Sequence, residues 1–241
     1  MSADDADPLA WLSSLEGVPS GFAAARDGVD AMLRDRGMRR TTPEQTAESL
    51  LRGAQASAVL EGSGSSLEEV REGAGDEVAQ AALRISAEVL SLVPVLARSP
   101  LQAFARLHAL AGAGSVEEER LGRPVTDVAA ERVGTLAQTL VTTSQPAMLV
   151  AAVAHAELAV VAPFASHNGL VARAVERLLL VSRGVDPASL VVPEAGHLAL
   201  RREYESNLRG YRDGGRAGMH AWLLYAAEAY ARGAEASPLR D

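Results

Sequence analysis

The sequence predicts an all-α protein. Apolar residues recur at helical spacing in successive segments between residues 43 and 232, and Gly, Pro and Ser clusters separate these segments. No segment shows the polar–apolar alternation of a half-buried strand. At 241 residues, 48% of them hydrophobic, the chain can bury the core of one domain. We expect a helical domain over residues 42–235, an N-terminal segment over 1–41 that is partly disordered or forms short helices, and a tail over 236–241.

The predicted elements can be taken in order. Residues 1–8 are expected to be disordered, and 9–36 to be broken by glycines and a proline into short helices or turns. Thr42, Pro43 and Gln45 then predict a capped helix over 43–61, which ends before Gly62. A second capping box follows at Ser66 and Glu69. Further helices are predicted at 77–93, 100–111, 128–143, 146–161, 170–183, 199–211 and 217–232, with a short extended piece at 190–192.

The aromatic residues concentrate in the last two predicted helices, where we expect them to form part of the core because large aromatic side chains supply much of the buried area of a domain. They are Tyr204, Tyr211, Trp222, Tyr225 and Tyr230.

Composition argues against several classes of protein. A net charge of -8 and a pI near 5.2 argue against nucleic acid as the main partner. The chain has no cysteine, so disulfides and thiolate metal sites are excluded. Its acidic start is unlike a signal peptide, and the apolar run 147–161 is too short and too polar for a membrane span.

The chain contains no lysine and is rich in alanine, which is typical of a GC-rich genome. We expect a bacterial, cytoplasmic protein.

The loop from Val161 to Arg173 carries most of the functional signal. Pro163 and the Asn168-Gly169 step predict a turn, because proline lacks a backbone donor and Asn-Gly readily takes left-handed angles. The free N–H groups at the start of the next helix would point back into this loop. We expect a loop that could bind an anion.

The segment from Ala154 to Arg173 resembles the core of the Fic (Fido) family, whose signature is His-x-Phe-x-Asp/Glu-Gly-Asn-Gly-Arg-x-x-Arg. The positions that match are Phe164, Asn168, Gly169 and Arg173. The signature residues His, Asp/Glu, Gly and the first Arg are replaced, respectively, by Ala162, Ser166, His167 and Leu170. Upstream, Ser57, Glu61 and Gly62 resemble the family's autoinhibitory pattern Ser/Thr-x-x-x-Glu-Gly/Asn. The two matches follow the family's order along the chain.

The resemblance implies a Fic-like helical bundle and, in active members, transfer of AMP from ATP to a protein hydroxyl. It also implies that the signature histidine is the base and that the acid holds magnesium. Ala162 cannot accept a proton, Ser166 is a weak magnesium ligand and Leu170 brings no charge to a phosphate. We therefore expect a pseudoenzyme with no catalytic residue, no metal and no cofactor, which acts by binding an unknown protein. ATP and Mg²⁺ would bind only if the chain is a divergent transferase.

The histidines offer one alternative. His167 could act as a relocated base, although a loop histidine without a catalytic role is the preferred interpretation. His155 and Glu157 are two residues apart and point to different faces of a helix, so His155 is expected to be a hydrogen-bonded core residue. The other histidines are scattered, and no metal site is predicted.

Two further expectations follow from the resemblance. Residues 112–127 are shorter than the segment that carries a target-docking hairpin flap in family members, so target docking is in doubt as well. Glu61 and Arg173 are expected to form a direct ion pair between their helices. Three hypotheses stand at this point: a degenerate Fic-like protein, a divergent Fic transferase, and a helical adaptor unrelated to that family.

Overall fold

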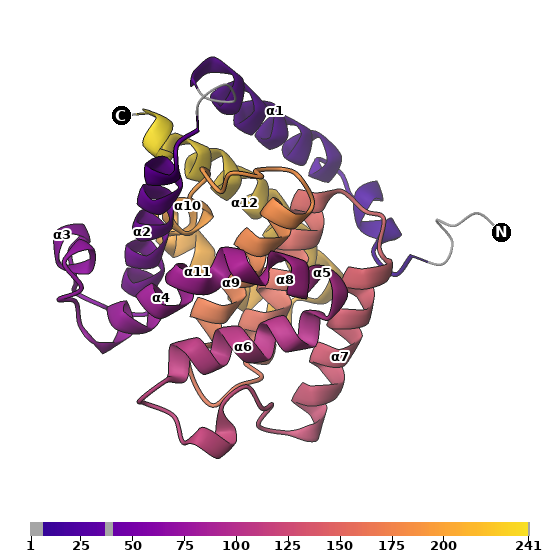
Figure 1. Ribbon diagram of the computed structural model, residues 1–241. Helices are drawn as coiled ribbons and strands as arrows, with labels where there is room; N and C mark the ends of the chain where they lie inside the picture. The colour runs from indigo at the N-terminus through magenta and orange to yellow at the C-terminus, as the bar shows by residue number, and fades with distance from the viewer. Residues whose placement is uncertain (1–6, 37–40, 241) are drawn as a thin grey trace.

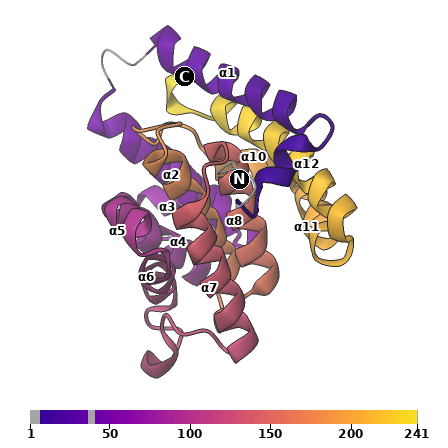
Figure 2. The same cartoon turned by 90° about the vertical axis from the view of Figure 1, so that its right-hand side faces the viewer.

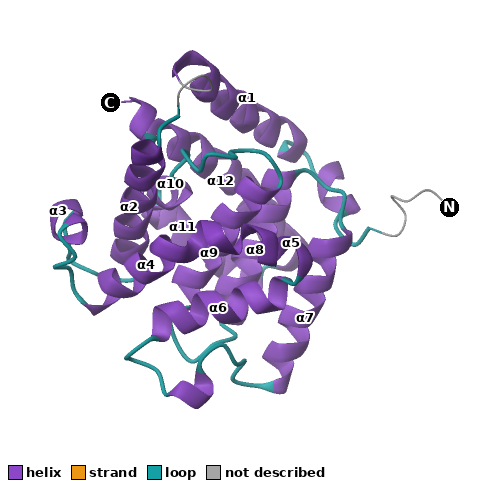
Figure 3. Ribbon diagram, viewed as in Figure 1, coloured by secondary structure: helices purple, strands orange, loops and turns teal. Residues whose placement is uncertain are grey.

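The regular structure of the protein is helical. The computed structural model describes residues 7–36 and 41–240, and these ranges contain α-helices and short 3₁₀ helices but no strand (Figures 1 and 3). The all-α prediction is confirmed. The predicted disorder of residues 1–8 concerns mainly residues 1–6, which lie outside the described residues. Asp7 is ordered, because its carboxylate accepts hydrogen bonds from Thr143 Oγ1 and from the backbone N–H of Ser144, each at 2.9 Å.

Helices α8 (Ala147–Val161) and α9 (Asn168–Ser182) lie side by side at the centre of the molecule (Figures 1 and 2). Every residue of α8 from Met148 to Ala156 is buried, and a helix that is apolar on all sides needs neighbours all round. The helices that contact this central pair include α2 (Pro43–Leu60), α4 (Glu77–Glu88), α6 (Pro100–Gly112), α7 (Asp127–Thr142), α11 (Arg201–Asp213) and α12 (Gly215–Glu235).

Both predicted capping boxes are present. At the start of α2 the Thr42 side chain accepts from the backbone of Gln45, and the Gln45 side chain accepts from the backbone of Thr42. Ser66 and Glu69 make the same reciprocal bonds at the start of α3 (Leu67–Arg71). These bonds satisfy N–H groups that have no partner within the helix, so the local sequence is enough to define both helix starts.

The N-terminal segment differs from the prediction. After the 3₁₀ helix Ala10–Ser14, residues Val18–Arg36 form one continuous helix, α1, instead of short pieces. Pro19 falls in its first turn, where a missing N–H costs no hydrogen bond. Gly21 faces α12, and a Cβ there would lie only 3.3 Å from the Cβ of Ala227. Packing along α12, visible in Figure 2, therefore outweighs the low helix propensity of the glycines.

The predicted helix 77–93 is interrupted. It divides into α4, a 3₁₀ turn at Val89–Leu92 and α5 (Val93–Arg98). Pro94 has no N–H to offer the carbonyl of Leu90, so the α-helical ladder cannot continue unchanged through this point. By length and composition alone Glu77–Arg98 is apolar enough to cross a membrane; in the fold its Ile85 and Leu96 are buried in the core.

The C-terminal part contains one helix that the prediction missed, α10 (Pro193–Ala199), and α11 accordingly begins at Arg201. Gly196 of α10 lies against α12 so closely that a Cβ would collide with the backbone carbonyl of Ala229. The aromatic prediction is confirmed, since Tyr211 is partly buried and the other four residues, Tyr204, Trp222, Tyr225 and Tyr230, are buried. The chain ends with a 3₁₀ turn at Pro238–Arg240 whose Leu239 is buried in the core.

Candidate functional site

The loop between α8 and α9 turns at positions other than those predicted. The left-handed residues are Ala162, with φ 45°, and His167, with φ 57°. Asn168 and Gly169 instead form the first turn of α9, which begins two residues earlier than predicted. The Asn168 side chain closes the loop, because its Oδ1 accepts from the backbone N–H of Phe164 and its Nδ2 donates to the carbonyl of the same residue, both at 2.9 Å. Asn168 therefore has a structural role in holding this loop.

The ion pair expected between Glu61 and Arg173 is present. Arg173 Nη2 lies 2.7 Å from Glu61 Oε1, and the arginine side chain is 1% exposed while that of Glu61 is 33% exposed. Arg173 Nε also donates to Ser57 Oγ at 2.7 Å, Nη2 to the Ser57 carbonyl at 3.2 Å, and Nη1 to the hydroxyl of Tyr204 at 3.0 Å. The guanidinium thus joins α2, α9 and α11.

The carboxylate of Glu61 also covers the start of α9. A Cβ at Gly169 would collide with Glu61 Oε1. The N-terminus of a helix attracts anions, through its free N–H groups and its dipole. The predicted anion site therefore already lies next to a carboxylate of the chain itself, that of Glu61 at the end of α2.

Among the four positions that differ from the Fic signature, only His167 brings a base into the loop. Ala162 is exposed at the end of α8, whereas Leu170 is 2% exposed and belongs to the core. Ser166 Oγ and His167 Nδ1 lie 2.6 Å apart. Burial lowers the pKa of His167, and the positive charge of Arg84 adds to this effect. His167 is accordingly neutral near pH 7 and hydrogen-bonded to Ser166.

Segment 112–127 is held against the loop. His108 of α6 accepts from the N–H of Gly122 at 2.8 Å through Nδ1, and its ring stacks on that of Phe164 with centroids 4.4 Å apart. The N–H of Val125 donates to the carbonyl of Pro163 at 2.8 Å. Phe164, which matches the Fic signature, therefore packs as a core residue, and the backbone N–H of Val125 already has a partner.

His108 predicts a pH dependence of stability. Burial, assisted by His167, lowers the pKa of His108 from 6.5 to about 4. Between these values the unfolded chain binds a proton that the folded chain does not, so the contribution of neutral His108 is complete above pH 6.5 and is lost as the pH falls through 4. We expect the free energy of unfolding, measured by urea denaturation, to be lower at pH 5 than at pH 7. This decrease should be larger in the wild type than in His108→Asn. The asparagine Oδ1 can still accept from Gly122, and equal falls in both proteins would contradict the assignment.

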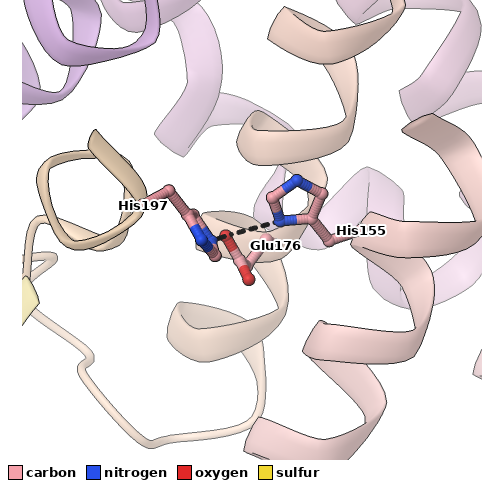
Figure 4. Close-up of side chains that lie close together, drawn as sticks. All are labelled: His155, Glu176 and His197. Carbon is pink, nitrogen blue, oxygen red and sulfur yellow. Dashed lines mark hydrogen bonds and ion pairs between the residues drawn. The ribbon is translucent and has the colours of Figure 1, made fainter. Parts of the chain in front are cut away.

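The structure brings together three residues that have no evident connection in the sequence. His155 of α8, Glu176 of α9 and His197 of α10 meet in the core (Figure 4). Burial by itself would raise the pKa of Glu176, but the two histidines hold it well below its usual range. His155 is a hydrogen-bonded core residue as predicted, with Nε2 at 3.0 Å from the hydroxyl of Tyr204. The sequence carried little signal for this cluster: His155 lies in a helix that is apolar except for Glu157, but Glu176 lies among other charged residues of α9, Arg173 and Arg177.

Comparison with solved structures agrees with this geometry. The fold is similar to that of a Fic family protein from Desulfovibrio desulfuricans G20, with a TM-score of 0.72 and 17% sequence identity over 90% of this chain and 73% of that one. It is also similar to Fic-1 from C. elegans, with a TM-score of 0.67 and 17% identity over 91% of this chain and 71% of that one. The chain has a Fic-like fold. The fold is therefore not unrelated to that of Fic proteins, as the helical-adaptor hypothesis had assumed. The sequence itself matches no family model and no curated protein.

The two partial Fic motifs occupy one site of this Fic-like fold. Ser57 and Glu61 at the end of α2 contact Arg173 of α9, and Glu61 also reaches Gly169. The motifs are more than 100 residues apart in sequence, so this proximity is independent of the pattern by which they were found. Gly62 follows the pair in a left-handed conformation, with φ 95°, and ends α2.

Proposed function

We propose that this chain is a degenerate Fic-fold protein that does not transfer AMP and acts by binding a protein partner. The observation that carries the proposal is the Glu61–Arg173 pair, which places a carboxylate beside the start of α9. In the loop that precedes α9, Ala162 occupies the position at which the Fic signature has its histidine base. A nucleotide phosphate would compete there with Glu61 for Arg173, and like charges repel. AMP transfer requires a general base and a positive charge that is free to bind the phosphate. Here Ala162 is not a base, and Arg173 is already paired with Glu61.

The composition supports the rest of the proposal. The net charge of -8 favours a protein partner over nucleic acid, and we place the protein in the cytoplasm of a bacterial cell, with no membrane partner and no nucleotide cofactor. Thermal unfolding tests the cofactor. ATP with Mg²⁺ at millimolar concentration is expected to leave the melting temperature unchanged, because a ligand raises it only by binding the folded state. A rise that saturates at micromolar ATP would contradict the proposal.

A second candidate, a divergent Fic transferase, is favoured by the bond between Ser166 and His167. At 2.6 Å the neutral imidazole can accept a proton from the serine hydroxyl, and a target hydroxyl in the place of Ser166 would meet the same base. Incubation with labelled ATP and a bacterial lysate separates the two candidates. Labelling that needs His167, so that His167→Ala abolishes it while His220→Ala does not, would establish the transferase.

Restoring the signature is expected to be insufficient for activity. The variant combines Ala162→His, Ser166→Asp, His167→Gly and Leu170→Arg. The docking segment would still be short, and the N–H of Val125 would still be bonded to Pro163, so a target strand could not be aligned; positioning of reactants contributes several kcal/mol to catalysis.

We expect no more than trace auto-modification of this variant with labelled ATP, also when Glu61→Gly is added to free Arg173. Circular dichroism of each variant serves as the folding control. Strong labelling would show that segment 112–127 suffices for docking and that decay of the signature alone accounts for inactivity.

A further inference from the structure

Three side chains from three helices converge on one point in the core. Glu176 Oε2 lies 3.0 Å from His155 Nδ1 and 2.9 Å from His197 Nε2, and these three atoms all lie within 4.8 Å of one another (Figure 4). All three side chains are 0% exposed. Two imidazole nitrogens and one carboxylate oxygen form a common set of ligands for divalent transition metals in proteins.

The other heteroatom of each of these residues is held by a tyrosine. His155 Nε2 lies 3.0 Å from the hydroxyl of Tyr204, and His197 Nδ1 lies 2.8 Å from that of Tyr225. The hydroxyl of Tyr230 donates to Glu176 Oε1 at 2.9 Å. In metal sites the atom of a ligand that does not face the metal is usually fixed by such a hydrogen bond, which orients the ligand. The tyrosines thus aim Nδ1, Nε2 and Oε2 at the same point.

One of the converging atoms has no hydrogen-bond partner. His155 Nδ1 is buried and lies 3.0 Å from Glu176 Oε2, close enough for an ion pair but not aligned for a well-formed hydrogen bond. A proton on Nδ1 would make only a poorly aligned bond to this carboxylate, and a bare lone pair on Nδ1 would face its negative charge. Buried polar atoms in proteins are satisfied in the great majority of cases, so this one indicates an additional partner. A cation between Nδ1 and Oε2 satisfies both atoms.

The charges in the core leave Glu176 without an arginine. Arg173 is paired with Glu61, and Arg177 is paired with Glu194 at 2.6 Å. Glu176 contacts only the two histidines and Tyr230 among the polar side chains of the described residues. A buried carboxylate is costly unless a cation compensates it, and here either a protonated histidine or a metal ion can do so. A protonated His155 would pair with Glu176 only through the poorly aligned Nδ1, whereas a metal ion would bind Nδ1, Nε2 and Oε2 together, which is why we favour the metal.

We propose that His155 Nδ1, His197 Nε2 and Glu176 Oε2 bind one divalent transition metal ion, with Zn²⁺ as the best fit to this ligand set. The ion would fasten α8, α9 and α10 together. The site is distinct from the loop between α8 and α9 and does not depend on the proposed function, although the hydroxyl of Tyr204 bridges His155 and Arg173.

Refolding is the appropriate test, because a site with no exposed side chain exchanges metal slowly in the native state. The full chain is unfolded in guanidinium with a chelator, desalted and refolded with Zn²⁺, with Co²⁺ or with chelator alone. We expect about one metal ion per chain by mass spectrometry, a higher melting temperature with Zn²⁺ than with chelator, and a visible absorption band of bound Co²⁺. Wild type that refolds fully in the chelator and takes up neither metal overturns the proposal.

Variants locate the site. His155→Gln and Glu176→Gln each remove a ligand and should abolish stoichiometric Co²⁺ binding. Tyr225→Phe removes only a hydroxyl and should weaken binding by about 10–100-fold, which keeps the proposal testable should Glu176→Gln fail to fold. Tyr211→Phe is the matched control, because its hydroxyl bonds Glu157 outside the cluster, and it should bind as wild type does. Equal Co²⁺ affinity in His155→Gln and in wild type would assign the metal elsewhere and refute the site.

Discussion

Replacing Glu194 with alanine is expected to lower the free energy of unfolding by about 3–5 kcal/mol, because it leaves the charge of Arg177 buried and unpaired. The two side chains are 6% and 4% exposed, and the guanidinium donates to both carboxylate oxygens, at 2.9 and 2.6 Å. Arg177 also donates to Ser189 Oγ at 2.8 Å, which does not replace an anion. Urea denaturation at pH 7 measures the effect.

Helix α2 passes close to the Arg177–Glu194 pair at Gly53. A Cβ at Gly53 of α2 would lie 2.6 Å from Arg177 Nη2 and 2.9 Å from Glu194 Oε2, so α2 crosses directly above the pair. Glu205→Ala is the matched control. It removes one partner of the Arg201–Glu205 pair, whose side chains are 45% and 48% exposed, and should cost at most about 1 kcal/mol. Similar losses in both variants would show that the buried pair is not stabilised as its geometry indicates.

The second large effect is expected at Glu61 and Arg173. Glu61→Ala should cost about 2 kcal/mol, which lies between the values typical of exposed and of fully buried pairs, because one third of the Glu61 side chain remains in contact with solvent. Arg173→Met should cost about 3–5 kcal/mol, since it removes a buried side chain that also donates to Ser57 and Tyr204.

A double-mutant cycle isolates the contact between them. If the ion pair docks α2 on α9, the double variant should be less destabilised than the sum of the single variants, by about 1 kcal/mol or more. Urea denaturation of the four proteins gives the coupling energy. Strictly additive effects would show that the two charges act independently and that their proximity contributes nothing to docking.

Local sequence predicted most helices because the signals for them are local. Thr42 with Gln45 and Ser66 with Glu69 satisfy N–H groups within four residues, so their effect does not depend on the rest of the fold. The helix predictions were wrong where contacts with residues distant in the sequence determine the structure. The glycines of α1 indicated breaks, but packing on α12 keeps that helix continuous, and α10 is a short helix seated on α12.

The candidate site likewise has features that the sequence predicts and features that only the fold determines. The resemblance of Ser57, Glu61, Gly169 and Arg173 to the two Fic motifs predicts the ion pair, but not the bond from Arg173 to Tyr204. It did not reveal that Ala162 and His167 take the left-handed angles, or that Asn168 holds the loop through Phe164. Backbone angles in a short loop follow from the positions of the two helices that it joins.

By itself, then, the sequence determined the helical class, the two capped helix starts at Thr42 and Ser66, and the pairing of Glu61 with Arg173. Each of these rests on local hydrogen bonding, on helical periodicity or on a motif. Only the tertiary structure decided that His155, Glu176 and His197 meet, and that three tyrosines from α11 and α12 orient them. These residues have no common spacing along the chain, because the packing of five helices around one buried carboxylate brings them together.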